Sequence, residues 1–201
     1  MSKKHLFALV VCSAALASTA ATADVTQAPA DAEQQSSAAQ GDVNEAAMRR
    51  VLEQFRTTRV PLGQAMAIAE RLHDGSRTAD ISFEISGPPV YRVRTVKNER
   101  VFENVIDAST GSVSQAELVS SLKELDRADL ANIIALKWTK QELSDAVRVA
   151  EKATSGNALA GGLMEQDGKI NFVVVVASGD RLKEVMLEPP KVGRPAAAQH
   201  R

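Results

Sequence analysis

An internal repeat constrains the fold of this chain more than any other feature of its sequence. The segment Ala65–Gly75 (AMAIAERLHDG) resembles Ala146–Gly156 (AVRVAEKATSG), which lies 81 residues later. Two unrelated alanine-rich helices would not keep one register through later glycines and aromatic residues, so we interpret the pattern as a tandem duplication. The same spacing, without a gap, aligns Thr58 with Thr139, Gly87 with Gly168, Tyr91 with Phe172, Val93 with Val174, Arg100 with Arg181, Glu103 with Glu184 and Asp107 with Glu188.

Each copy is predicted to contain a helix with one apolar side. A capping box formed by Thr139 to Glu142 predicts the start of the second helix. Gly75 and Gly156 stand where the end of a helix favours a positive φ. Apolar residues recur at helical spacing in both copies: Leu62, Ala65, Met66 and Ala69, and Leu143, Ala146, Val147 and Ala150.

A further helix is expected before each of these two. An apolar stripe predicts a helix over 44–57, and Ser114 to Glu117 offers a capping box for a helix over 115–137. The charged stretch from Asp126 to Asp129 could divide that second helix. Trp138, the only tryptophan, follows it and is expected to anchor the hinge between the two copies.

Three strands are expected after the capped helix of each copy. In the first copy, alternation of apolar and polar residues predicts strands at Ile81–Ile85 and Tyr91–Thr95, with a third at Val101–Ile106. In the second copy, Phe172–Val176 and Leu182–Leu187 are the later strands.

These elements together predict an α+β fold of two tandem repeats, each with helices packed on its own three-stranded antiparallel β-meander. The first repeat is expected over 44–113 and the second over 114–188. Asp167-Gly168 predicts a tight hairpin turn within the second meander. Two separate sheets, one for each repeat, follow from this interpretation.

The N-terminal segment has the pattern of a secretory signal peptide. Two lysines precede the apolar run Leu6–Leu16, which ends in small residues and the cleavage pattern Ala21-Thr22-Ala23. The run is about half of the ~20 residues that a membrane-spanning helix needs. We therefore expect residues 1–23 to be removed after Ala23, with an uncleaved membrane anchor as the alternative.

The expected mature protein is exported to the periplasm or secreted, with no stable membrane insertion after signal cleavage. Residues 24–43 and 189–201 contain few large apolar residues, so we expect a disordered linker and a disordered tail. The single cysteine, Cys12, lies in the removed segment, and a cysteine-free chain tolerates an oxidising compartment.

Composition and motifs argue against several classes of function. The 24 basic and 25 acidic residues give a formal net charge of −1, which argues against nucleic acid as a partner, because binding phosphates needs a basic face. Three scattered histidines argue against a metal site, and no motif indicates a catalytic nucleophile or a cofactor. Carboxylates that recur between the copies, Glu70 with Glu151 and Asp107 with Glu188, are expected to serve the fold. We therefore expect no enzyme activity.

Two sequence motifs resemble those of the PepSY family. Gln64–Gly75 and Asp145–Gly156 are similar to the alanine-rich helix of that family. Ile106–Val113 (IDASTGSV) is similar to the family's closing motif, whereas Leu187-Glu188-Pro189-Pro190 departs from it in the second copy. The resemblance covers roughly 58–113 and 139–190.

This resemblance implies a non-enzymatic binding protein with two PepSY-like domains. PepSY domains occur in the propeptides of thermolysin-like metallopeptidases and in secreted bacterial proteins, and the family is thought to restrain peptidases. The implied partner is therefore a protein or peptide, such as a peptidase that the chain restrains or regulates. The alternative is a ligand-binding or accessory module of an envelope sensing system.

One asymmetry between the copies suggests where a partner binds. Arg92 and Arg94 of the first copy align with Val173 and Val175 of the second. The first meander would then have a charged outer face, while the second would be apolar on both faces. Because apolar surface is usually covered, the valines should contact the other repeat, the helix between the repeats, or a partner. We predict these four residues as partner-binding positions.

Overall fold

A computed structural model describes residues 45–114, 117–166 and 169–189. The expected signal peptide (1–23), linker (24–43), Asp167-Gly168 turn and all but the first residue of the tail lie outside these ranges. The chain divides into a unit that ends at Arg50 and a unit from Val51 onward, and every strand within the described residues belongs to the second unit.

Two helices of the second unit bury one side each, at the predicted spacing. Residues 45–56 form a helix that begins in the first unit. It is followed by α2 (Leu62–Leu72), and α4 (Leu143–Thr154) occurs later in the chain. The predicted stripes are confirmed, since the buried residues are Leu62, Ala65, Met66 and Ala69 in α2, and Leu143, Ala146, Val147 and Ala150 in α4.

The start of α4 differs from the prediction. Its N-cap residue is Glu142, which makes no side-chain capping bond. Thr139 instead ends the preceding helix, α3 (Arg127–Trp138), where its hydroxyl donates to the carbonyl oxygen of Ala135 at 2.9 Å. The predicted capping box from Thr139 to Glu142 is therefore wrong, because α3 already uses the threonine.

The two glycines expected at helix ends have different roles. Gly75 has a φ of 77°, as predicted, whereas at the end of α4 the left-handed residue is Ser155, with a φ of 51°. Gly156 lies against the neighbouring strand, where an added Cβ would be 2.3 Å from the carbonyl oxygen of Ala177. The prediction of a positive φ at Gly156 is wrong, and the glycine is needed there for a close approach of two backbones.

The helix expected over 115–137 is divided. Strand β4 (Leu118–Ser121) and the short 3₁₀ helix η1 (Leu122–Glu124) precede α3. Asp126 is the N-cap of α3 and accepts a hydrogen bond from the backbone N–H of Asp129 at 2.9 Å. The alternative in which the stretch around Asp126 breaks the helix is therefore correct, whereas Ser114 to Glu117 does not begin a helix that runs to residue 137.

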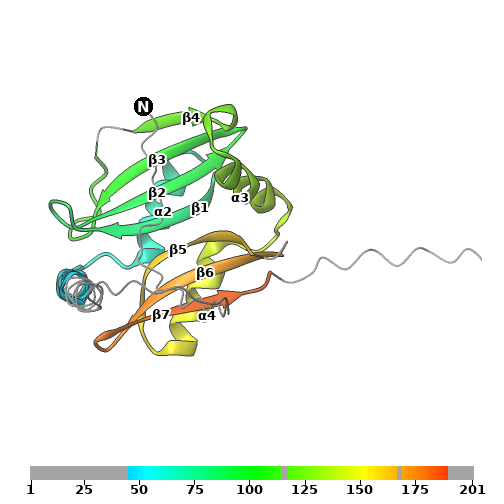
Figure 1. Cartoon of the computed structure of the whole chain (residues 1–201). Helices are drawn as coiled ribbons and strands as arrows, with labels where there is room; N and C mark the ends of the chain where they lie inside the picture. Colours follow the sequence, from blue (N-terminus) through cyan, green and yellow to red (C-terminus); the bar gives the residue numbers. More distant parts are fainter. Residues whose placement is uncertain (1–44, 115–116, 167–168, 190–201) are drawn as a thin grey trace, which may run out of the picture. The chain divides into compact units, whose positions relative to one another are not determined.

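The strands form one antiparallel sheet of seven (Figure 1), not two separate sheets of three. The order across the sheet is β4-β3-β2-β1-β5-β6-β7. The prediction of two sheets is wrong because β1 and β5 pair edge to edge. That pairing gives hydrogen bonds to backbone N–H and C=O groups that would be unpaired at the edges of two separate meanders. The remaining strands are β1 (Arg77–Glu84), β2 (Val90–Lys97), β3 (Arg100–Asp107), β5 (Asn157–Gln166), β6 (Lys169–Ser178) and β7 (Arg181–Leu187).

The strand pairing of the first meander (β1, β2 and β3) corresponds closely to that of the second meander (β5, β6 and β7). Tyr91 pairs with Ile106 as Phe172 pairs with Leu187, which keeps the spacing of 81. Across the first hairpin of each meander, Ile81 pairs with Val93 as Gly161 pairs with Val174, so β1 and β5 follow a spacing of 80. Ile81 and Gly161 then pair with each other where the meanders join. The constant spacing of 81 residues predicted from the sequence is therefore wrong by one residue at β5. A tandem duplication of the two halves stays an interpretation.

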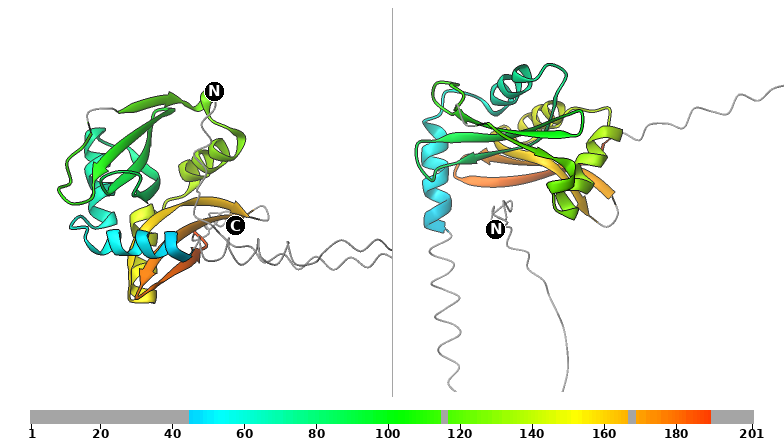
Figure 2. Two further views of the ribbon diagram at one scale, coloured as in Figure 1. Left: turned by 60° about the vertical axis from the view of Figure 1, so that its left-hand side comes forward. Right: turned by 90° about the horizontal axis from the view of Figure 1, so that it is seen from above.

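Helices cover both faces of the sheet (Figure 2). Helices α2 and α4 lie on one face and α3 lies on the other. The face under α2 and α4 holds the core, where Tyr91, Val93 and Ile106 of the first meander are fully buried. Paired residues of neighbouring strands lie on the same face of a sheet, so Ile106 of β3 faces the core together with Tyr91. Glu103 lies three residues earlier in β3 and therefore faces the opposite side.

Candidate functional site

Arg92 and Arg94 lie on the face opposite α2, where both are used in ion pairs. Arg92 donates two hydrogen bonds to Glu84, at 2.8 and 3.0 Å, and a third to Glu103. The hydrogen bond to Glu84 raises the pKa of Arg92 above its ordinary value, although burial opposes the shift. The guanidinium group is therefore already held by two carboxylates of the sheet.

Arg94 ties α3 to the sheet. It donates to Asp80 Oδ2 of β1 at 2.7 Å and to both carboxylate oxygens of Asp129 in α3, at 2.8 and 3.1 Å. Burial raises the pKa of Asp80 from 3.8 to about 6, although the charge of Arg94 opposes that rise. Asp80 and Asp129 therefore share one guanidinium group beneath α3.

Val173 and Val175 lie on this same face in β6 and are already covered. Val173 pairs with Gly162 and Met186, and only 7% of its surface is exposed, against 5% for Val175. Their coverage agrees with the expectation that this apolar face is not bare. Binding of a partner by Val173, Val175, Arg92 and Arg94 stays a prediction, since it would require displacement of existing contacts.

An exposed apolar face on α3 was missed by the sequence reasoning. Trp138 is 80% exposed and Ile134, one turn earlier, is 45% exposed. Trp138 therefore does not anchor a hinge by burial, and that prediction is wrong. Ile133 and Leu136 of the same helix are buried. The signal was available in the spacing, because residues 133 and 136 share one side of a helix while 134 and 138 share another.

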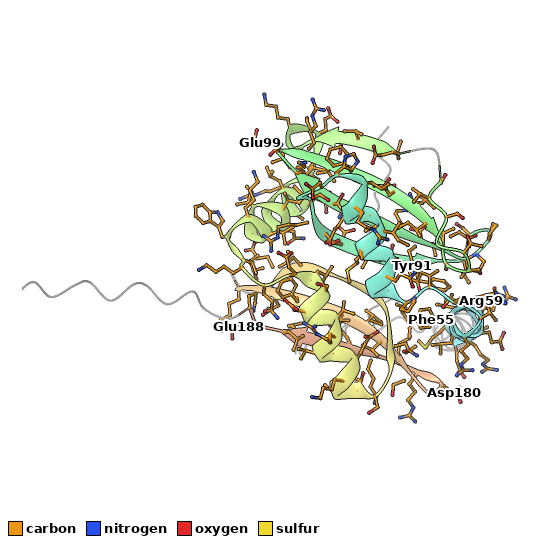
Figure 3. The ribbon with its side chains drawn as sticks, turned by 180° about the vertical axis from the view of Figure 1, so that it is seen from behind. Phe55, Arg59, Tyr91, Glu99, Asp180 and Glu188 are labelled. Carbon is orange, nitrogen blue, oxygen red and sulfur yellow. The ribbon has the colours of Figure 1, made fainter. Side chains whose placement is uncertain are left out.

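A pocket of about 380 Å³ lies where the two meanders meet, near the start of α2. Figure 3 shows Phe55, Arg59 and Tyr91, three of its lining residues, gathered in one region. The pocket draws residues from both halves of the chain, so no single sequence motif encodes it. Its walls are formed by Phe55, Arg56, Thr58, Arg59, Val60, Pro61, Leu62, Tyr91, Glu151, Asn157, Ala158, Ala177 and Gly179.

Tyr91 and Glu151 are two polar residues that line this pocket. The Tyr91 hydroxyl donates to the carbonyl oxygen of Val60 at 2.8 Å. Burial raises the pKa of Tyr91, and the negative charge of Glu151 adds to that rise. Glu151 Oε1 accepts a hydrogen bond from the backbone N–H of Ala158 at 2.9 Å.

Three of the four recurring carboxylates, Glu70, Glu151 and Asp107, have structural partners, as expected; a role for Glu188 stays a prediction. Glu70 accepts from the backbone N–H of Thr78 at 3.0 Å, in the same way as Glu151 does from Ala158. Asp107 accepts from the backbone N–H groups of Thr110 and Ser109, and these bonds lower its pKa. Asp107 thereby closes the turn after β3.

The described part of the chain has neither a metal-binding cluster nor a membrane-spanning helix. Within 45–114, 117–166 and 169–189, no group of three or more histidine, cysteine, aspartate or glutamate side chains could hold a metal ion. None of the helices in that part of the chain is long and apolar enough to cross a membrane.

Comparison with known proteins finds one family match, which covers the first meander and the helix before it. A crystal structure of a "putative lipoprotein" from Clostridium difficile 630 is similar at 18% identity and a TM-score of 0.39, over 67% of this chain and 89% of that one; this likeness is too weak to carry an argument. No curated protein matches the sequence. Residues 59–114 match the family described as "Peptidase propeptide and YPEB domain", or PepSY. This range holds α2, β1, β2 and β3, so the predicted resemblance to the PepSY family is confirmed over residues 59–114.

Proposed function

We propose that this protein is an exported, non-enzymatic binding protein that binds and restrains or regulates a protein partner such as a peptidase. The observation that carries the proposal is the match of residues 59–114 to a family described by peptidase propeptides. PepSY domains are generally non-catalytic modules that resemble propeptides, so this domain fits an accessory or binding role. Restraint of a peptidase is the specific form of that role for which we argue.

The second half of the chain is proposed to be a second PepSY-like unit. Its support is the agreement of the two ladders, in which the pairs Tyr91–Ile106 and Phe172–Leu187 occupy matching places. The matching apolar stripes of α2 and α4 add to it. Two such units in one sheet would present a larger rigid surface to a partner than one unit could.

The exposed side of α3 is the surface that we propose for the partner. Trp138 and Ile134 place a large aromatic and a branched side chain one turn apart in solvent. Exposed aromatic residues that become buried on association supply much of the binding energy of protein interfaces. A partner with an apolar recess next to this helix would cover both side chains.

The proposal is tested by inhibition of peptidases and by variants of α3. Secreted thermolysin-like metallopeptidases are assayed with and without the purified protein, and we expect dose-dependent inhibition of at least one. Trp138→Ala should weaken inhibition at least about tenfold, the loss typical of an interface hot spot. Val149→Ala, which alters an apolar residue of α4 that is 47% exposed, is the matched control and should inhibit like the wild type.

Two results would contradict this proposal. If no secreted peptidase from the same source is inhibited or bound by the protein, the restraint of a peptidase is excluded. If the Trp138→Ala and Val149→Ala variants inhibit equally well, the partner does not bind through α3.

Export is a separate part of the proposal. The pattern in residues 1–23 predicts that the mature chain begins at Asp24 and is found in the periplasm or the medium. Cell fractionation with N-terminal sequencing of the recovered protein tests both statements. Recovery of full-length protein from the cytoplasm alone would contradict them.

The pocket favours a second candidate function, that of a ligand-binding or accessory module in an envelope sensing system. Its volume of about 380 Å³ is in the lower part of the range seen for small-molecule sites. Co-purification with a sensor kinase rather than with a peptidase would favour this function over the first.

A further inference from the structure

Glu70 and Glu151 hold corresponding places in α2 and α4 but do not have the same partners. Glu70 Oε1 accepts two hydrogen bonds from Thr78, one from its backbone N–H at 3.0 Å and one from its hydroxyl at 2.7 Å. Glu151 Oε1 accepts only the backbone N–H of Ala158, at 2.9 Å, among the described residues. Ala158 stands beside a bulge in β5 as Thr78 does in β1. Because alanine has no hydroxyl, the Glu151 carboxylate keeps acceptor capacity that Thr78 uses in the first half.

The pocket lies where this difference occurs. Glu151 and Ala158 line it, whereas Glu70 and Thr78 do not. Glu151 is half-buried, and its charge contributes to the raised pKa of Tyr91 in the same pocket. An ionised carboxylate with spare acceptor positions in a partly desolvated site is best satisfied by a cationic hydrogen-bond donor. An ammonium group has that chemistry.

A positive charge stands at the same pocket. Arg56 and Arg59 both line it. Arg56 is paired with Asp180 and donates to the carbonyl oxygen of Gly179 at 2.9 Å. For Arg59, which is exposed, no side-chain hydrogen bond or ion pair occurs with any residue that the structure describes. The pocket therefore offers one carboxylate and one guanidinium group that a ligand could engage.

We propose that this pocket binds a small zwitterion of amino-acid or dipeptide size, with its ammonium group at Glu151 and its carboxylate at Arg59. The apolar part of the ligand would contact Val60, Phe55 and Ala177, which complete the walls. The proposal rests on the ligand-binding alternative above. It shares no residue with the exposed face of α3, so either proposal can fail without the other.

Titration calorimetry with the dipeptide L-alanyl-L-leucine tests the ligand class. We expect a Kd below about 1 mM, and at least about tenfold weaker binding of both the N-acetylated dipeptide and the dipeptide amide, each of which lacks one charge. Free L-leucine is measured in parallel, and the tighter of the two zwitterions gives the size of the ligand. No heat of binding for either zwitterion up to about 10 mM would overturn the proposal, as would equal binding of the N-acetylated form.

Variants of the two carboxylates then test the position of the ligand. Glu151→Gln should weaken binding of L-alanyl-L-leucine at least about tenfold, since it removes the charge that pairs with ammonium. Glu70→Gln is the matched control, because it makes the same change at the corresponding place outside the pocket, and it should bind like the wild type. Equal affinity of Glu151→Gln and the wild type would overturn the proposal.

Two further variants extend the test, and the first of them keeps it independent of folding. Arg59→Gln alters an exposed residue and should keep the wild-type thermal midpoint while it weakens binding at least about tenfold. Ala158→Thr restores the hydroxyl of the first half, which would compete for Glu151 and weaken binding. Unchanged binding by Arg59→Gln would overturn the proposed orientation of the zwitterion. Trp138→Ala should leave dipeptide affinity unchanged, which separates this test from that of partner binding.

Discussion

Replacement of Gly156 by alanine should be far more damaging than its position at a helix end suggests. An added Cβ would lie 2.3 Å from the carbonyl oxygen of Ala177 and 2.8 Å from Cγ1 of Val176. Ordinary carbon contacts are about 3.5–4.0 Å, so the backbones must separate by roughly 1 Å. Neither neighbour moves easily, because Val176 is fully buried and β-branched and Ala177 is held in the ladder by its pairing with Asn157.

The expected loss of stability follows from this overlap. Forcing an extra carbon into a packed site costs about 1–3 kcal/mol, and the rigid backbone places Gly156→Ala at about 2–3 kcal/mol. The reduced freedom of the unfolded chain offsets only about 0.4–1 kcal/mol of the gross cost. Equilibrium unfolding in urea, followed by circular dichroism, measures the difference.

Gly75→Ala is the matched control, since nothing lies within 4 Å of an added Cβ there. Its φ of 77° alone should cost about 1–2 kcal/mol. Ser155→Gly should stabilise the protein by several tenths of a kcal/mol, up to about 1 kcal/mol, because Ser155 is the residue with a positive φ. The reasoning is refuted if Gly156→Ala is no more destabilising than Gly75→Ala.

Three other predictions concern the face that carries α3. Because burial raises the pKa of Asp80 to about 6 in the folded state, its contribution to stability is greatest below about pH 4 and falls by about 3 kcal/mol as the pH rises to about 6. Unfolding free energies of the wild type and Asp80→Asn should therefore diverge across that range, and a constant difference would disprove the shift. Arg94→Met should cost about 3–5 kcal/mol and accelerate hydrogen exchange in α3, since it leaves Asp80 and Asp129 without their cation; unchanged exchange would show that the ion pair does not hold the helix. Trp138→Ala should change stability by less than about 0.5 kcal/mol, and wild-type tryptophan fluorescence should be readily quenched by iodide; protection from iodide would contradict the 80% exposure.

Local features of the fold were predictable from the sequence. The apolar stripes of α2 and α4 and the alternation in β2 depend on periodicity, which each segment carries by itself. The resemblance of residues 59–114 to PepSY was also predictable, because the helix and the turn closed by Asp107 lie in one continuous stretch.

Features that depend on distant segments were not predictable in the same way. The capping box at Thr139 is locally convincing, but the end of α3 uses the same hydroxyl. The β1–β5 pairing joins segments about 80 residues apart, and neither strand shows that its edge is covered. The pocket was missed for the same reason, since Arg59 and Glu151 are brought together only by the fold.

The join between the meanders also determines where the protein could polymerise by strand addition. Since β1 and β5 cover each other, the terminal strands of the described sheet are β4 and β7. Strand β4 has only four residues, and β7 carries the exposed charges of Lys183 and Glu184. Short or charged edges resist the addition of further strands. Pairing at the centre therefore removes two edges that could seed fibrils and leaves the less adhesive ones outermost.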